Sequence, residues 1–180
     1  FGFKNMLKNA GISIENKVVM ILGSGGTSKT SHAVVKDLGA KKIYIVSRKG
    51  EINYQNCYEL NDTEVIINTT PVGMYPNTNQ SPVDLSRFNN LEGVADVIYN
   101  PFITKLTYQA QELKMKNTNG LAMLVAQAKY AMELFLDKKI SDELAEAIAD
   151  ITEKYARTPS NGKALMNSLP GKPWIAHEEY

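Results

Sequence analysis

The stretch "KVVMILGSGGTSKT" (residues 17–30) joins a short apolar, β-branched run to a glycine-rich loop. The apolar run predicts a buried β-strand over residues 17–23. The residues after the loop predict a helix that ends near Gly39. A strand, a glycine loop and a helix in this order are typical of a nucleotide-binding α/β unit.

Ser28 leaves two interpretations of this loop open. The dinucleotide-binding motif G-x-G-x-x-G fits Gly23 and Gly25 and requires a third glycine at position 28. The ATP-binding P-loop motif G-x-x-x-x-G-K-[ST] fits Gly23, Lys29 and Thr30, and it requires the same glycine. The loop by itself does not decide between them.

The later strands favour the dinucleotide interpretation. A P-loop protein needs an acidic residue at the end of a later strand to organise magnesium. The strand "EVIIN" (64–68) ends without one, and we expect Asp96 in the middle of its strand. A P-loop phosphotransferase therefore stays only as an alternative.

Further apolar strands alternate with helical segments along the chain. This alternation predicts an α/β fold, a doubly wound and mostly parallel sheet with flanking helices. The connection over residues 48–63 shows no helical pattern, so we expect a short crossover without a helix there. The other expected strands are 42–47, 64–70, 94–100 and a short one within 116–120, and the expected helices are 3–10, 104–114 and 121–136.

The composition bounds the functional class. The 180 residues carry a net charge of +1 and 43% hydrophobic residues, so we expect neither nucleic acid nor a membrane as a partner. Cys57 is the single cysteine, which excludes an internal disulfide framework and is compatible with the cytoplasm. We expect two parts, a dinucleotide-binding domain over 1–140 and a C-terminal helix (141–157) with an irregular tail to residue 180.

The end of the second strand suggests which dinucleotide binds. An NAD site has an acidic residue there for the ribose hydroxyl, whereas an NADP site favours a cation for the 2′-phosphate. Here the strand ends in Ser47, Arg48 and Lys49. The Arg48 guanidinium is suited to a phosphate group, so the pair of cations favours NADP.

Two further stretches each leave two interpretations open, a ligand contact or, respectively, an ordinary turn and a helix residue that faces water. "NTTPVGM" (68–74) follows the third strand at the carboxyl edge of the sheet, where ligands of open α/β sheets bind. In "GLAMLVAQA" (120–128), Gly120, Met123 and Gln127 fall on one face of a helix, and Gln127 offers hydrogen bonds to a polar ligand.

Taken together, five segments resemble the cofactor-binding domain of the shikimate dehydrogenase family in order and spacing. The resemblance covers roughly residues 1–136, and the opening "FGF" resembles the end of the segment that joins the two domains of that family. It implies a Rossmann-like fold and the NADPH-dependent reduction of 3-dehydroshikimate to shikimate, in the biosynthesis of aromatic amino acids and chorismate. The segments are "GSGGTSK" (23–29), "VSRK" (46–49), "NTTPVGM" (68–74), "DVIYNP" (96–101) and "GLAMLVAQA" (120–128).

The resemblance also implies a role for individual residues. One group would hold the cofactor pyrophosphate, a second would face the 2′-phosphate, a third would line the cofactor and its nicotinamide, and a fourth would reach the substrate. These groups are, in turn, Gly23, Ser24, Gly25, Gly26 and Thr27; Ser47, Arg48 and Lys49; Thr69, Val97, Gly120 and Met123; and Tyr99 and Gln127.

The chain departs from the family pattern in two respects. The usual N-R-T-x-x-R clamp for the 2′-phosphate has Ser47, Lys49 and Ile52 in place of its Asn, Thr and second Arg. The family's catalytic Lys–Asp pair belongs to an N-terminal substrate domain that this chain lacks. Neither Lys105 nor Asp96 matches a catalytic motif, so we expect no catalytic residue and no metal site here.

These departures keep several interpretations open. We expect a fragment of the whole enzyme that is inactive alone, with shikimate or 3-dehydroshikimate bound through the missing domain, and with a homodimer as one arrangement. A quinate/shikimate dehydrogenase that prefers NAD and a dinucleotide-binding module without catalysis are the alternatives.

Overall fold

The computed structural model describes residues 2–141 and 148 of the chain. Most of the predicted helix 141–157 and the tail that follows it lie outside these residues. The described helices are α1 (Gly2–Asn9), α2 (Gly26–Asp37), α3 (Lys105–Glu112) and α4 (Leu121–Leu136). The strands are β1 (Val18–Leu22), β2 (Lys42–Val46), β3 (Val65–Asn68), β4 (Gly93–Asp96) and β5 (Lys116–Thr118).

The five strands form one parallel sheet in the order β2-β1-β3-β4-β5. All residues of β1, β3 and β4 are buried, because helices or loops cover both faces of the sheet. Strand β2 lies on one side of β1 in the sheet, and the next strand along the chain, β3, lies on the other side of β1. The carboxyl ends of β1 and β3 therefore form the topological switch point, where ligands of such sheets bind.

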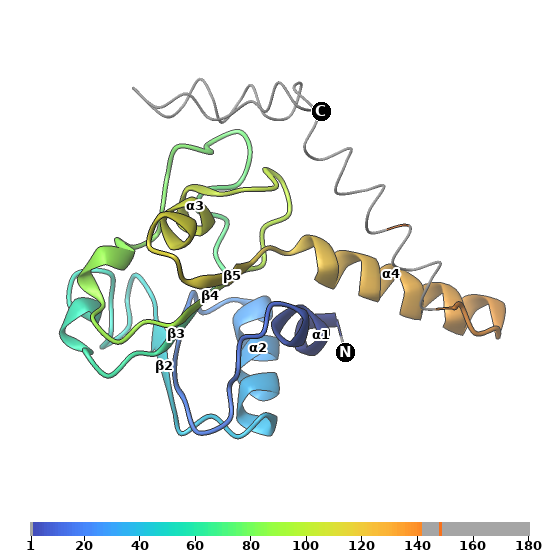
Figure 1. The fold of residues 1–180 in the computed structure, drawn as a ribbon, viewed down its shortest axis with the longest axis horizontal. Helices are drawn as coiled ribbons and strands as arrows, with labels where there is room; N and C mark the ends of the chain where they lie inside the picture. The colour runs from blue at the N-terminus through green and yellow to red at the C-terminus, as the bar shows by residue number, and fades with distance from the viewer. Residues whose placement is uncertain (1, 142–147, 149–180) are drawn as a thin grey trace.

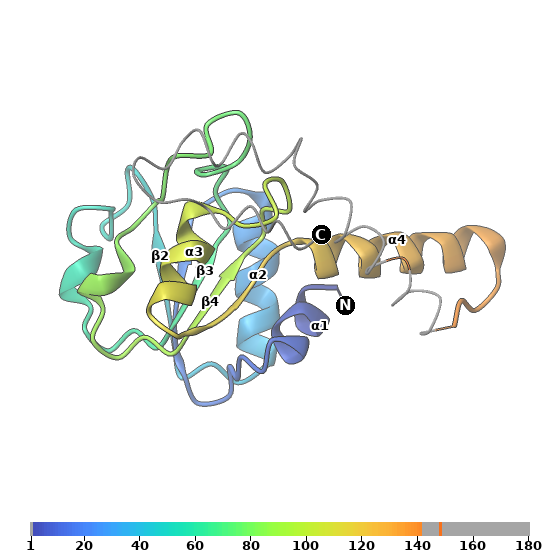
Figure 2. The same ribbon diagram turned by 45° about the horizontal axis from the view of Figure 1, so that its top comes forward.

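Two hydrophobic cores lie on opposite faces of the sheet. Val19 and Ile21 of β1 pack with α1, with Val35 of α2 and with residues at the start of α4. Met20 and Leu22, whose side chains point the other way, pack in the core that contains Leu106 of α3. Figures 1 and 2 show α1 and α2 on one side of the sheet and α3 on the other.

Helix α4 starts beside the sheet and then projects away from it (Figures 1 and 2). Its first turns pack against α1. Toward its end it carries several large apolar side chains in exposed positions, and Phe135 is 90% exposed. The others are Tyr130, Met132, Leu134 and Leu136.

The structure confirms the predicted α/β fold and corrects the length of two strands. The strands predicted over 64–70 and 94–100 end at Asn68 and Asp96, because the chain turns away after both to form loops. Asp96 therefore ends its strand, and the expectation of a mid-strand position is wrong. The connection after β2 contains only a 3-10 turn at Cys57–Glu59, as the missing helical pattern predicted.

No helix among the described residues is long and apolar enough to cross a membrane.

Candidate functional site

The glycine loop begins with a residue that the fold itself requires to be glycine. The Gly23 amide donates a hydrogen bond of 2.8 Å to the Val46 carbonyl, at the end of β2. The φ angle of Gly23 is +110°, and a Cβ atom there would lie 2.7 Å from Thr69 Oγ1. Gly23 therefore lets the end of β1 lie directly against the loop that follows β3.

The next two glycines have no such neighbours. A Cβ atom added to Gly25 or to Gly26 would meet no protein atom within 4 Å. Gly25 is the N-cap residue of α2, and no side chain caps the first amides of this helix. Exposed amides at a helix N-terminus form a site for a phosphate group, and here there is open space for one. Ser24 and Thr27 are exposed at the same loop.

Ser28, the residue that breaks both sequence motifs, lies inside the fold. Its side chain is 3% exposed, and its hydroxyl donates a hydrogen bond of 2.7 Å to the Gly23 carbonyl. The hydroxyl thus ties the start of α2 to the glycine loop, where the motif has a third glycine. Lys29 is exposed in the first turn of α2.

A tight turn follows β2 and carries the predicted phosphate-binding cations. The Ser47 amide donates to the Ile52 carbonyl (3.1 Å), which closes the turn over residues 47–52. Arg48 and Lys49 are exposed at this turn, and Ser47 is half-buried. Ile52, at the place of the family's second arginine, packs against the core and brings no charge.

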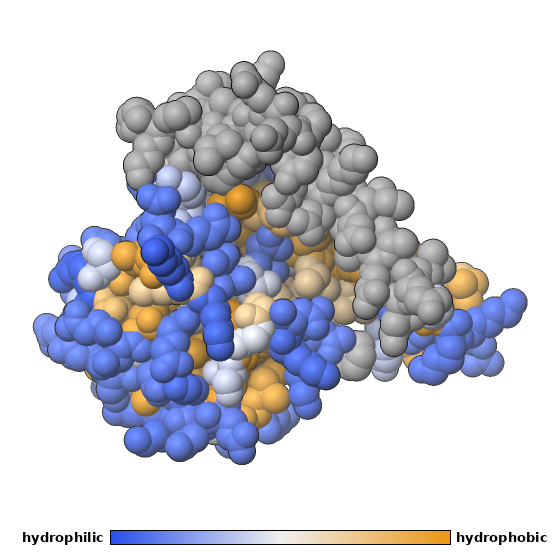
Figure 3. Space-filling model, in the orientation of Figure 1, coloured by the Kyte–Doolittle hydropathy of each residue, from blue (hydrophilic) through white to orange (hydrophobic). Residues whose placement is uncertain are grey.

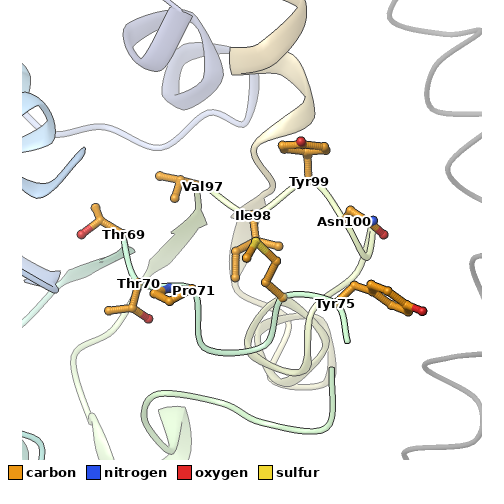
Figure 4. A pocket seen from close by; sticks show the side chains of 9 residues that line it. Thr69, Thr70, Pro71, Tyr75, Val97, Ile98, Tyr99 and Asn100 are labelled. Carbon is orange, nitrogen blue, oxygen red and sulfur yellow. The ribbon is translucent and has the colours of Figure 1, made fainter. Parts of the chain in front are cut away.

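A cavity of about 340 Å³ lies beside the glycine loop, between the loops that follow β3 and β4. Figure 4 shows the two loops side by side, from Thr69 and Val97 at one end to Tyr75 and Asn100 at the other. The Thr69 amide and hydroxyl both donate to the Leu22 carbonyl, at 2.9 and 2.6 Å, so the cavity adjoins the glycine loop. Its lining residues are Thr69, Thr70, Pro71, Met74, Tyr75, Val97, Ile98, Tyr99 and Asn100.

The cavity contains only some of the predicted ligand-binding residues. Thr69, Val97 and Tyr99 line it, and Tyr99 is 50% exposed. Gly120 is buried behind its wall, where its amide donates to the Ile98 carbonyl (2.9 Å) and where a Cβ atom would overlap the Val97 carbonyl.

The two predicted residues on α4 lie apart from this lining. Met123 is half-buried against the core that contains α1. Gln127 is exposed, and its Cγ atom would lie 3.4 Å from a Cβ atom on Gly2 of α1.

Sequence reasoning missed a buried carboxylate at the end of β4, directly before the loop that lines the cavity. The Asp96 side chain is fully buried, and its Oδ1 atom accepts hydrogen bonds from Asn68 Nδ2 (3.0 Å) and the Ile98 amide (3.1 Å). Its Oδ2 atom accepts one from the Thr104 hydroxyl (2.7 Å). A charged residue inside the apolar run 94–98 is the sequence signal that could have indicated this site, since a fully buried aspartate needs partners.

Burial raises the pKa of Asp96 from 3.8 to about 6, while the hydrogen bonds from Thr104, Ile98 and Asn68 lower it in part. With all three hydrogen bonds donated to it, the carboxylate is enclosed by protein groups and is not free to ligate a magnesium ion. Among the described residues, no group of three or more His, Cys, Asp or Glu side chains could hold a metal ion.

The fold, the glycine loop and the adjoining cavity define a Rossmann-like α/β domain with a cavity at its switch point, where ligands of such sheets bind. No protein-family model matches the sequence. Individual proteins, however, are similar to it in sequence. The shikimate dehydrogenase (NADP(+)) of Clostridium beijerinckii is 34% identical over 164 residues, which cover 85% of this chain and 61% of that protein. The shikimate dehydrogenase (NADP(+)) of Caldicellulosiruptor bescii is 33% identical, over 85% of this chain and 60% of that protein.

Solved structures of shikimate dehydrogenases are also similar to this chain in fold. A chorismate mutase/shikimate 5-dehydrogenase fusion protein from Clostridium acetobutylicum matches with a TM-score of 0.82 and 35% identity, over 87% of this chain and 61% of that one. A shikimate dehydrogenase solved in complex with NADP+ matches with a TM-score of 0.68 and 25% identity, over 84% of this chain and 60% of that one. The chain is a homologue of the shikimate dehydrogenases, and it spans about 61% of the length of the curated relatives that it matches.

The pKa of Asp96 predicts how stability depends on pH. Because the folded state binds this proton more tightly than the unfolded chain, the contribution of Asp96 to the free energy of unfolding increases as the pH falls from about 7 to about 4. The expected gain is up to about 3 kcal/mol. Urea unfolding of the wild type and of Asp96→Asn at several pH values measures it, since other groups cancel in the difference. A difference that is flat over this range contradicts the prediction.

Proposed function

We propose that the chain is the NADP-binding domain of a shikimate dehydrogenase, an oxidoreductase that reduces 3-dehydroshikimate to shikimate with NADPH in chorismate biosynthesis. The observation that carries the proposal is the open glycine loop at the start of α2, beside the cavity at the switch point. The relatives that are named shikimate dehydrogenase (NADP(+)) support the choice of cofactor and substrate.

In this proposal the loop binds the pyrophosphate through its backbone. The amides at the start of α2 face the phosphates, and Gly25 and Gly26 leave the space that the phosphates need. Ser24 and Thr27 add hydroxyl groups, and Gly23 fixes the position of the loop. Lys29 follows in the first turn of α2 and has no part in binding.

The exposed turn after β2 binds the adenosine 2′-phosphate. Arg48 supplies a planar guanidinium for two parallel hydrogen bonds, and Lys49 adds a second positive charge. Ser47 contributes its hydroxyl at the start of the turn. Because Ile52 brings no charge, the preference for NADP over NAD is smaller than with two arginines.

The cavity between the two loops accepts the nicotinamide end of the cofactor. Thr69 and Val97 line this end, Tyr99 reaches the substrate from the rim, and Gly120 keeps the wall thin behind Val97. Met123 and Gln127 join the site from α4 in the whole enzyme. The bound cofactor supplies a hydride for the ketone of the substrate.

The substrate pocket and the proton donor belong to a further domain of the whole enzyme. The apolar side chains on the projecting part of α4 support this, because they form a surface suited to packing against another domain. Figure 3 shows hydrophobic groups on this end of the helix. Association into a homodimer and a place in the cytoplasm complete the proposal for the whole enzyme.

The alternative within the same family is a quinate/shikimate dehydrogenase that prefers NAD. The neutral Ile52, packed against the core where a second arginine would stand, is the observation that favours it. The relative affinity for NADP and NAD separates the two.

Two separate substitutions, one at Gly25 and one at Lys29, test the role of the loop in binding. We expect Gly25→Val to abolish NADP binding, because its side chain would occupy the phosphate space, and Lys29→Ala to change the affinity little. Calorimetric titration with NADP, and with ATP plus magnesium, measures both. Thermal unfolding is the control, and Gly25→Val should stay folded because the added Cβ meets no protein atom. Magnesium-dependent ATP binding that Lys29→Ala removes would overturn the proposal.

Arg48→Ala tests recognition of the 2′-phosphate. A charge-assisted phosphate contact contributes roughly 1.5–3 kcal/mol, so NADP affinity should fall about 10- to 100-fold while NAD affinity stays nearly constant. Lys41→Ala is the matched control, because it removes an exposed positive charge before β2 begins, at the opposite end of that strand. Equal losses for NADP and NAD in Arg48→Ala would show that Arg48 does not contact the phosphate.

The 180-residue chain alone should show no dehydrogenase turnover. A hydride transfer to a ketone needs a group that protonates the developing alkoxide, and the proposal assigns that group to the further domain. The measurement is the reduction of NADP by the purified chain with shikimate present. A rate above that of the Gly25→Val variant would contradict this division of roles.

A further inference from the structure

We propose that Asp96 is a positioning residue of the cavity, whose ionised carboxylate holds the loop after β3 and the loop after β4 in the arrangement that binds the ligand. The proposal concerns the shape of the cavity in the free protein. Only its consequence for NADP affinity rests on the proposed function.

The carboxylate accepts from three separate segments. Asn68 is the last residue of β3, Ile98 lies in the loop after β4, and Thr104 is the N-cap residue of α3. Each of the three groups donates its hydrogen bond, and an ionised carboxylate is an acceptor without a hydrogen of its own. The ionised form of Asp96 therefore satisfies all three donors at once.

The first loop is oriented through Asn68. The side-chain amide of Asn68 donates to Asp96, which turns its Oδ1 atom toward Thr70. That oxygen accepts from the Thr70 amide (3.0 Å) and the Thr70 hydroxyl (2.7 Å). The Thr70 hydroxyl in turn accepts from the Val72 amide (3.2 Å). The position of the Thr70–Pro71 wall thus depends on the orientation that Asp96 gives to Asn68.

The second loop is held at both of its ends. The Ile98 amide binds one oxygen of the carboxylate and the Thr104 hydroxyl binds the other, so the segment between them forms a closed loop. Tyr99 and Asn100 lie in this segment and line the cavity. The Tyr75 amide donates to the Asn100 carbonyl (3.2 Å) and joins the two loops at their far end.

Charge pairing does not explain the position of Asp96. The causes of its pKa shift are burial and the three hydrogen bonds, and no charged side chain of the described residues is among them. A buried carboxylate without a cation is costly, and apolar residues would fill the same space at lower cost. What the carboxylate provides is a shared acceptor for groups that border both of the loops lining one cavity.

A pH titration of the free wild-type chain, followed by nuclear magnetic resonance, tests the shared acceptor directly. The Ile98 backbone amide and the Asn68 side-chain amide should shift together with one midpoint near 6, the pKa of Asp96. In Asp96→Asn, which keeps the shape of the side chain, this common shift should disappear. If the two amides do not move together in the folded wild type, the proposal is wrong.

Two threonine variants separate positioning from a general effect on the helix. Thr104 and Thr107 are both buried and form the capping box of α3, but only Thr104 contacts Asp96. In Thr104→Val the midpoint of the Ile98 titration should rise by about one pH unit, because a hydrogen bond to the ionised form is lost. In Thr107→Val, the matched control, the midpoint should shift by much less, because the Thr107 hydroxyl reaches the carboxylate only through the Thr104 hydroxyl, 3.2 Å away.

The affinity for NADP gives the functional result. We expect a loss of about tenfold in Thr104→Val and of less than about twofold in Thr107→Val, with Thr104→Ser close to the wild type. Equal losses in Thr104→Val and Thr107→Val would overturn the proposal, since the helix cap would then explain both. If the wild type itself does not bind NADP, the proposed function fails, while the titration of Ile98 and Asn68 still decides the role of Asp96.

Discussion

The close contact between the end of β1 and the loop after β3 determines the rest of the site. Thr69 donates two hydrogen bonds to the Leu22 carbonyl, and this approach is open only because Gly23 has no side chain. The contact places the glycine loop on one side of Thr69 and the cavity on the other. A phosphate group at the start of α2 and a ring in the cavity could therefore belong to one extended ligand, as the proposed NADP would require.

Much of this arrangement could be predicted from local patterns. The apolar runs predicted the strands because both faces of a parallel sheet are buried, and glycines after a strand predicted the loop. The patterns failed at the strand ends. Ile98 is as apolar as a strand residue and is buried, but it lies in a loop, so the composition of the run 94–98 concealed the turn. Hydrophobicity records burial and does not record where the backbone changes direction.

The partners of Asp96 could not be predicted for a related reason, although its place in an apolar run indicated that it needs some. Its three donors lie at positions 68, 98 and 104, and they meet only when β3 and β4 pair side by side. Ser28 shows the opposite case, in which a departure from a motif is explained by a local hydrogen bond to Gly23. The exposed apolar end of α4 is a third case. Its sequence predicts a helix correctly but does not identify the surface that covers it.

The polarity of the cavity wall limits what it can bind. The Thr69 hydroxyl donates to Leu22 and the Thr70 hydroxyl donates to Asn68, so both hydrogens are used inside the protein. The methyl and methylene groups of Pro71, Val97 and Ile98 form much of the remaining lining. No Lys, Arg, Asp or Glu side chain is among the lining residues of this cavity. Such a surface suits a flat ring better than a phosphate, because a buried phosphate would lack donors. The positive charges lie instead at the turn after β2. The phosphate end of the proposed cofactor would therefore meet a charged surface, and its ring end a surface without charged side chains.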